Sequence, residues 1–162
     1  MKTFNQIVSS SKVDFSVSLD LDTRILSRII TSDGKGNEIC IKVDRGLVLE
    51  DGTLLANEDG QVLQVLAAFE NLSIVKAANL IELAKLAYHL GNRHVVLEVN
   101  DEGYLAYQTD HVLDDMVQKL GGILTHESRK FAPEKGAYAH HHSHDHEHHD
   151  HHEHDHHEHH HH

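Results

Sequence analysis

The sequence has one cysteine, one proline and no tryptophan among its 162 residues. A single thiol, Cys40, excludes an intrachain disulfide framework and is typical of a protein in a reducing cytosol. No apolar run approaches the roughly 18 residues of a membrane-spanning helix, and the N-terminus lacks the apolar centre of a signal peptide. We therefore expect a cytoplasmic protein that does not enter a membrane.

Basic residues are also scarce. The chain has 14 Lys and Arg against 26 Asp and Glu, which gives a formal charge of −12. Half of this charge lies in the first 139 residues, which hold 20 of the carboxylates and all 14 cations. An acidic surface repels phosphate groups. This charge therefore argues against binding to nucleic acid and to anionic membranes.

Catalytic motifs are missing as well. The chain has no HExxH, no GxSxG and no phosphate-binding glycine loop followed by Lys and Ser or Thr. Cys40 has no second cysteine to act with and falls in an apolar strand pattern, so we expect an inert buried thiol. The sequence therefore predicts a protein that is not an enzyme.

Histidine dominates the C-terminus instead. Residues 140–162 contain 16 of the 20 histidines, six carboxylates and Ser143, and no apolar side chain. The histidines are His140, His141, His142, His144, His146, His148, His149, His151, His152, His154, His156, His157, His159, His160, His161 and His162. Neutral imidazole suits Ni²⁺, Cu²⁺ and Zn²⁺, and the carboxylates attract cations. We expect a disordered, metal-binding tail at 140–162, because nothing in it can form a core.

Two simpler interpretations of this tail fit its composition less well. A purification tag is a short uniform histidine run, and only residues 159–162 fit that description. An ordinary solvated acidic tail uses Asp, Glu, Ser and Lys, and sixteen imidazoles do nothing for solubility. The interleaving of His with Asp and Glu therefore favours metal binding.

The first 70 residues have the two-residue period of strands. Apolar and polar side chains alternate over residues 13–22, and a second strand near 27–31 leads through a turn at 32–37 into a strand at 39–43. Another strand is expected at 61–69, and no segment has a convincing helical period. The pattern predicts a small all-β N-terminal domain at 1–70, built as a sandwich or open barrel.

Residues 71–130 combine helices with strands, so the whole chain is predicted to be α+β. The expected elements are a strand at 72–75, a helix capped by Asn79 and stopped by Gly91, strands at 95–99 and 104–107, a helix from Thr109 or Asp110 to Leu120, and a strand at 123–126. This βαββαβ order indicates a ferredoxin-like domain. Residues 131–139 then form a linker to the tail.

Four histidines precede the tail: His89, His94, His111 and His126. A single histidine is more often a surface or core residue than a ligand. His94 differs by its position in the short link between a helix end and a strand. His111 falls in a first helical turn with Asp114 and Asp115 at i+3 and i+4, a face that suits a cation. The alternative is ordinary capping by Asp110 and acidic residues that complement the helix dipole.

Several segments together resemble the UreE family of urease accessory proteins. They are residues 88–94 (YHLGNRH), 110–116 (DHVLDDM), 131–138 (FAPEKGAY), 45–49 (RGLVL) and 51–55 (DGTLL). The resemblance implies a nickel chaperone and a homodimer, with a β-rich domain followed by a ferredoxin-like metal-binding domain. It also implies that His94 meets its symmetry mate at the dimer interface and shares one metal ion with it.

The chain departs from this family at one place. Some members have histidines just before the Asp-His pair that opens the second helix, and this chain has Gln108 and Thr109 there. Only His111 remains of that group. A second set of metal sites in the folded part is therefore not expected from the resemblance.

We therefore expect a cytoplasmic, dimeric nickel metallochaperone. Its tail collects Ni²⁺, His94 and its mate hold one ion, and apo-urease with its accessory GTPase UreG receives it. The alternative is a storage or buffering protein for Ni²⁺, Zn²⁺ or Cu²⁺ without a delivery partner. The ligand types do not decide between these metals, because Cu²⁺ binds such sites more tightly than Ni²⁺.

Overall fold

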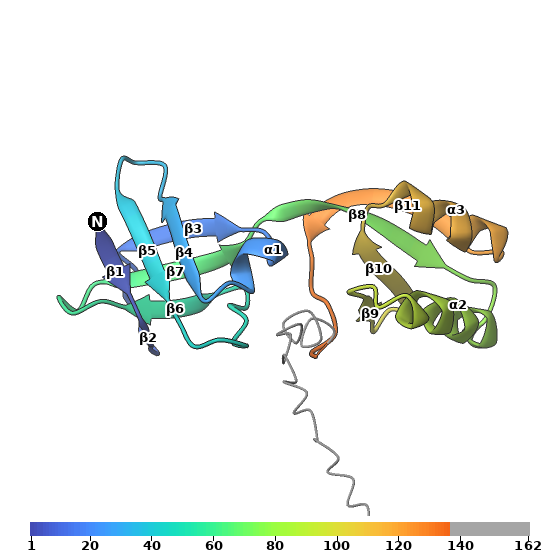
Figure 1. The fold of residues 1–162 in the computed structure, drawn as a ribbon, viewed down its shortest axis with the longest axis horizontal. Helices are drawn as coiled ribbons and strands as arrows, with labels where there is room; N and C mark the ends of the chain where they lie inside the picture. Colours follow the sequence, from blue (N-terminus) through green and yellow to red (C-terminus); the bar gives the residue numbers. More distant parts are fainter. Residues whose placement is uncertain (137–162) are drawn as a thin grey trace, which may run out of the picture.

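The structure, a computed structural model, describes residues 1–136, which form two lobes side by side along the long axis (Figure 1). They contain eleven strands in three sheets and three helices. The α+β fold class predicted from the sequence is confirmed. None of the helices in this part of the chain is long and apolar enough to cross a membrane.

The N-terminal lobe is a β-sandwich. Its strands are β1 (Lys2–Phe4), β2 (Gln6–Ile7), β3 (Phe15–Leu19), β4 (Arg28–Ser32), β5 (Glu38–Lys42), β6 (Thr53–Ala56) and β7 (Val62–Ala67). One sheet has the order β1-β5-β4 and the other β2-β6-β7-β3. Phe4, Ile39 and Ile41 of the first sheet and Leu55 and Leu63 of the second are fully buried in one shared core. Cys40 is a buried free thiol, as predicted.

Two strands predicted in this lobe were too long, and the one expected at 61–69 is β7, which ends at Ala67. The strand expected at 13–22 ends at Leu19, and the chain turns into a one-turn helix, α1 (Leu21–Arg24). Asp20 caps it, because its Oδ1 accepts a hydrogen bond of 2.9 Å from the Thr23 amide. Leu21 is buried in this helix, as it would be in a continued strand. The alternation of apolar and polar residues therefore does not distinguish the helical turn from a longer strand.

The C-terminal lobe has the predicted βαββαβ order. Its elements are β8 (Phe69–Lys76), α2 (Leu80–Asn92), β9 (Glu98–Asn100), β10 (Tyr104–Gln108), α3 (His111–Lys119) and β11 (Ile123–Lys130). The sheet order is β11-β8-β10-β9, with every neighbouring pair antiparallel. Because β10 lies between β8 and β9, this is the split arrangement of a ferredoxin-like domain.

Both helices pack on one face of this sheet. Leu86 and Leu90 of α2 and Val117 of α3 share a core with Val75 and Tyr107 from the strands. The helix starts were correctly predicted, because Asn79 and Asp110 accept hydrogen bonds from the amides of the first turns. Strands β8 and β11 are longer than predicted, since they pair with each other along their whole length.

The opposite sheet face packs against the N-terminal lobe. Leu72, Ile74 and Ala106 form a cluster there with Leu21 of α1 and with Phe131, which follows β11. Phe131 is only 2% exposed, and the amide of Glu134 donates to the Leu97 carbonyl at 2.8 Å. The first residues of the predicted linker are therefore docked onto the fold.

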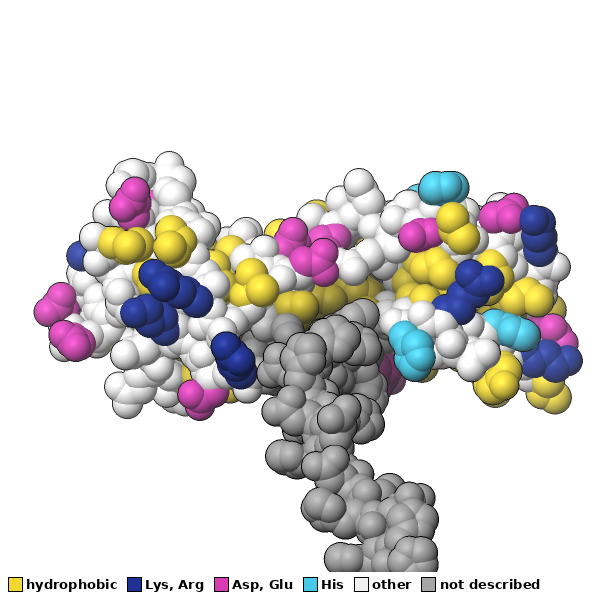
Figure 2. All heavy atoms as spheres, in the orientation of Figure 1, with side chains coloured by type: hydrophobic (Ala, Val, Ile, Leu, Met, Phe, Trp, Pro, Cys, Tyr) yellow, Lys and Arg dark blue, Asp and Glu magenta, His cyan; other side chains and the backbone are white. Residues whose placement is uncertain are grey.

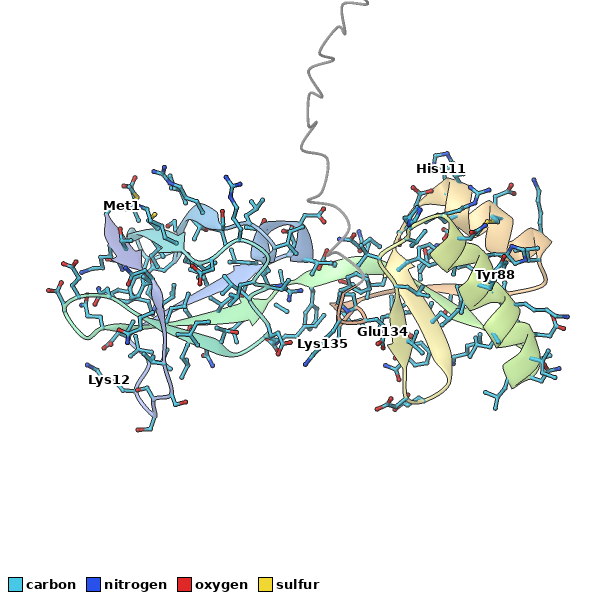
Figure 3. The ribbon with its side chains drawn as sticks, turned by 60° about the horizontal axis from the view of Figure 1, so that its bottom comes forward. Met1, Lys12, Tyr88, His111, Glu134 and Lys135 are labelled. Atoms are coloured by element: carbon cyan, nitrogen blue, oxygen red, sulfur yellow. The ribbon has the colours of Figure 1, made fainter. Side chains whose placement is uncertain are left out.

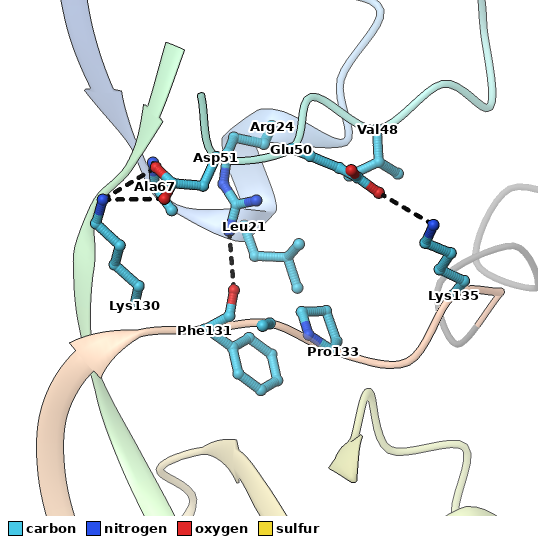
Figure 4. Close-up of a pocket in the computed structure, with 11 residues that line it drawn as sticks. Leu21, Arg24, Val48, Glu50, Asp51, Ala67, Lys130, Phe131, Pro133 and Lys135 are labelled. Atoms are coloured by element: carbon cyan, nitrogen blue, oxygen red, sulfur yellow. Dashed lines mark hydrogen bonds and ion pairs between the residues drawn. The ribbon is translucent and has the colours of Figure 1, made fainter. Parts of the chain in front are cut away.

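Arg24 ties the two lobes together. It is buried, and its guanidinium donates to the carbonyls of Leu19, Leu49 and Phe131 at 3.1, 3.2 and 3.3 Å. Around it lies a pocket of about 340 Å³, bordered by the ion pairs Lys130–Asp51 at 3.0 Å and Lys135–Glu50 at 3.8 Å (Figure 4). These contacts give the lobes a defined junction.

Candidate metal site

His94 follows the C-terminal end of α2 in an unusual backbone conformation. The helix continues through Gly91 and Asn92, so the predicted stop at Gly91 was wrong, and Arg93 is the C-cap. Among the described residues, His94 is the one non-glycine residue with a positive φ, at 56°. The left-handed conformation costs a residue with a Cβ about 1–2 kcal/mol.

The hydrogen bonds at this helix end explain why the conformation is held. The His94 amide donates to the Gly91 carbonyl at 3.0 Å, and the Val95 amide donates to the Leu90 carbonyl at 3.3 Å. This pair of bonds is the Schellman motif, in which the residue after the C-cap is left-handed and usually glycine. Leu90 and Val95 also pack in the same hydrophobic cluster. Helix packing therefore fixes the backbone, and the imidazole of His94 is carried outward.

His94 is exposed and borders an open surface depression of about 780 Å³. The depression is lined by Arg93, His94, Val95 and Val96 from the α2–β9 link and by Gln108, Thr109, Asp110, Val112 and Leu113 from the β10–α3 corner. Val112 is 54% exposed there. An imidazole beside exposed apolar side chains is suited to an interface that buries it.

Further apolar side chains are exposed along α2. Leu80, Ile81 and Tyr88 are 78%, 69% and 68% exposed. Figure 3 shows Tyr88 on the outer side of α2 and His111 at the exposed start of α3. In Figure 2 the visible histidine side chains all lie on this lobe, next to apolar patches.

His111 is exposed on α3 and does not line the depression beside His94. The structure therefore does not bring these two predicted ligands into one pocket. The chelating face predicted for His111, Asp114 and Asp115 is also not assembled. Asp115 pairs with Lys119 at 2.7 Å, and Asp114 is buried. Asp110 acts as the N-cap, which agrees with the alternative interpretation of this turn.

Asp114 is the centre of a polar cluster that sequence reasoning missed. Its Oδ1 accepts hydrogen bonds from the Ser73 hydroxyl at 2.6 Å and the Tyr107 hydroxyl at 2.5 Å, and its Oδ2 lies 2.8 Å from His126 Nε2. Burial alone raises the pKa of Asp114, but these three hydrogen bonds outweigh burial and hold the pKa below its ordinary value. Burial and the neighbouring carboxylate raise the pKa of Tyr107. Asp114 is therefore an ionised acceptor with three hydrogen-bond partners.

Within residues 1–136, no three His, Cys, Asp or Glu side chains are grouped closely enough to hold a metal ion. His89 is exposed on α2 and stacks edge-on against Tyr88. The predicted ligands between His140 and His162 lie outside the described residues. A complete coordination sphere at His94 therefore needs ligands from beyond residues 1–136 of one chain.

Comparison with known proteins covers nearly the whole chain. The family model described as UreE urease accessory protein, N-terminal domain, matches residues 4–68, and that of the C-terminal domain matches residues 70–162. A protein of Escherichia coli named urease accessory protein UreE is 42% identical over 144 residues, which cover 86% of this chain and 93% of the relative.

Two further relatives carry the same name. The protein of Pseudomonas putida is 46% identical over 134 residues, covering 82% of this chain and 83% of its own. The protein of Citrobacter koseri is 41% identical over 145 residues, which cover 86% of this chain and 95% of the relative.

Proposed function

Because the chain belongs to the UreE family of urease accessory proteins, we propose that it collects Ni²⁺ and delivers it to apo-urease during assembly of the urease metal centre. Membership of the family gives the chain a role in urease assembly. In this proposal the C-terminal lobe, predicted as residues 71–130, presents the ion for transfer, and residues 140–162 form the reservoir.

The observation that carries the proposal is the strained, exposed His94. Glycine fits the left-handed position after a helix C-cap without strain, and this chain has an imidazole there. Backbone strain that persists in a fold is a reason to look for a role of the side chain. An exposed imidazole on a rigid helix end is a suitable ligand for a borderline metal ion such as Ni²⁺.

One imidazole binds a metal ion only weakly, and a homodimer strengthens the site by supplying a second imidazole. A two-fold axis through the depression beside His94 brings two His94 side chains together without further ligands from the sequence. The same contact covers the exposed Val112. The remaining coordination positions are then filled by tail imidazoles, which the chain tethers at high effective concentration.

Delivery requires ligand exchange and no bond-making catalysis, so the protein acts as a chaperone and not as an enzyme. A site open to solvent at a dimer interface releases its ion to a more enclosed site by stepwise replacement of ligands. The receiving complex in this proposal is cytoplasmic apo-urease together with the GTPase UreG. The alternative is a buffer that binds Ni²⁺, Zn²⁺ or Cu²⁺ and has no delivery partner.

The rate at which apo-urease is activated distinguishes a delivery protein from a buffering protein. Purified apo-urease with its accessory proteins is supplied with Ni²⁺ bound to wild-type protein, to His94→Ala or to His89→Ala. His89 is the matched control, because it is an exposed imidazole on α2 outside the depression. We expect His94→Ala to lower the activation rate severalfold and His89→Ala to leave it unchanged. If wild-type protein activates no better than free Ni²⁺ at equal concentration, the buffering function is correct.

A further inference from the structure

The short link that carries His94 lies between α2, which ends at Asn92, and β9, which begins at Glu98. In the part of the chain that the structure describes, residues 93–97 belong to no helix or strand. The Schellman bonds fix only the helix end of this link. A left-handed residue with a Cβ persists only where the surrounding structure imposes its conformation. At the other end of the link the support comes from residues 131–134, the brace.

The brace follows β11 and contacts the link at two points. The amide of Glu134 donates to the Leu97 carbonyl at 2.8 Å. Phe131 is buried in the cluster against which Val96 packs, and Val96 also lines the depression beside His94. The brace therefore holds the backbone that leads away from His94, just as the Schellman bonds hold the backbone that leads to it.

Glu98 holds the brace in place. Its side chain is 3% exposed, and it accepts hydrogen bonds from the Ala132 amide at 2.9 Å and from two guanidinium nitrogens of Arg129 at 3.0 and 2.5 Å. A carboxylate bound by both arms of an arginine has a fixed orientation. Because Glu98 is the first residue of β9, it joins the end of the link, the end of β11 and the brace in one cluster.

We propose that the brace, held by Glu98, positions His94 for its metal ion. Glu98 and the amide of Glu134 are positioning groups that do not touch the ion. They keep the link in the conformation that presents the imidazole at the depression, and a ligand held in this way binds without a further cost of ordering. The effect on Ni²⁺ rests on the proposed function, whereas the effect on the His94 backbone does not.

The competing explanation is that the brace only joins the two lobes. Arg24 donates to the Phe131 carbonyl at 3.3 Å, and this bond is drawn in Figure 4. That junction contact is made by the first residue of the brace, whereas the bond to the His94 link is made by its last residue, Glu134. The two roles can therefore be separated by substitution at Glu134.

Glu134→Pro removes the amide that donates to Leu97, because proline has no backbone N–H. Glu134→Ala is the matched control, since it loses the same exposed side chain and keeps the amide. Glu98 itself is left intact, because removing its carboxylate leaves Arg129 without a partner charge and endangers the fold of the lobe.

The first measurement is hydrogen exchange of the full chain without metal. The amides of His94 and Val95 donate the two Schellman bonds, so their exchange rates report how firmly the link is held. We expect Glu134→Pro to speed both rates about five- to tenfold, the effect of losing one hydrogen bond. Glu134→Ala should exchange at the wild-type rates, and the amides of β10 should keep their protection in both variants.

The second measurement is Ni²⁺ titration of the ¹⁵N-labelled full chain. Paramagnetic broadening of the amides of residues 93–95 reports an ion at His94 separately from ions on the tail. Glu134→Pro should raise the Ni²⁺ concentration needed for this broadening about tenfold, as the loss of an outer contact does at other metal sites. Glu134→Ala should leave that concentration unchanged.

The inference is overturned if the proline and alanine variants show the same exchange at His94 and Val95. It is also overturned if Glu134→Pro exchanges faster and yet binds Ni²⁺ at His94 as the wild type does, because the brace then has no bearing on the ligand. If residues 93–95 of the wild type show no broadening at saturation, the proposed function fails, and the exchange rates still decide whether the brace holds the link.

Discussion

The two lobes differ in their histidine content. The first 70 residues contain no histidine, whereas the C-terminal lobe has four, and all four are exposed. The N-terminal lobe keeps its core apolar and its one thiol buried. Within residues 1–136, imidazole side chains are therefore confined to the C-terminal lobe.

The largest effect should come from removing the chain after Tyr138. This deletion takes away 16 of the 20 histidines. At two to four imidazoles per ion, it removes about four to eight Ni²⁺ ions per chain. Calorimetric titration measures the stoichiometry, and circular dichroism checks that the fold of the two lobes is retained. An unchanged stoichiometry would rule out the reservoir.

A second prediction tests whether the lobes depend on each other. Arg24→Met leaves three buried carbonyls, those of Leu19, Leu49 and Phe131, without the guanidinium, which should cost about 3 kcal/mol in urea unfolding. Lys135→Ala is the control, because its ion pair with Glu50 is exposed and should change stability by less than about 0.5 kcal/mol. Equal effects of the two variants would show that the buried contacts do not hold the junction.

A third prediction concerns acid stability of the C-terminal lobe. The pKa of Asp114 lies below its ordinary value of 3.8, so its contribution is present above that pH and is lost as the pH falls through the lowered pKa. The unfolding free energy of the wild type should therefore decrease in acid more steeply than that of Asp114→Asn. Urea unfolding at pH 7 and pH 3 measures both slopes, and parallel slopes would contradict the expectation.

The smallest effect should be a gain in stability. His94→Gly relieves the left-handed strain at φ 56° and should raise the unfolding free energy by about 1 kcal/mol, while it removes the proposed ligand. His94→Ala keeps a Cβ and should bring no such gain. Thermal unfolding of both variants separates backbone strain from side-chain loss. A destabilised glycine variant would mean that the imidazole itself supports the fold.

Much of the C-terminal lobe could be predicted because its signals are local. Asn79 and Asp110 begin helices by accepting bonds from amides two or three residues away. The strand order followed from turns and periodicity. In the N-terminal lobe the predicted strand extended too far at Leu21, because burial of this residue fits both a strand and the one-turn helix that Asp20 caps.

The polar centres could not be predicted, because their partners are distant in the sequence. The sequence indicates that Asp114 is an acidic residue of a first helical turn that complements the helix dipole. In the structure it forms hydrogen bonds with Ser73, Tyr107 and His126, which come from three different strands. The left-handed conformation of His94 could not be predicted from the sequence for a different reason. Gly91 suggested the helix end, and packing of Leu90 and Val95 extends the helix and moves the left-handed position to His94.

In the proposed dimer, His94 and its symmetry mate hold one ion between two chains. This arrangement is tested by Ni²⁺ titration of the full-length protein, with sedimentation run with and without metal. We predict a tightest class of about half an ion per chain, absent in His94→Ala and intact in His89→Ala, with metal favouring the dimer in the wild type and in His89→Ala but not in His94→Ala. A tightest class that survives in His94→Ala with unchanged stoichiometry would contradict it.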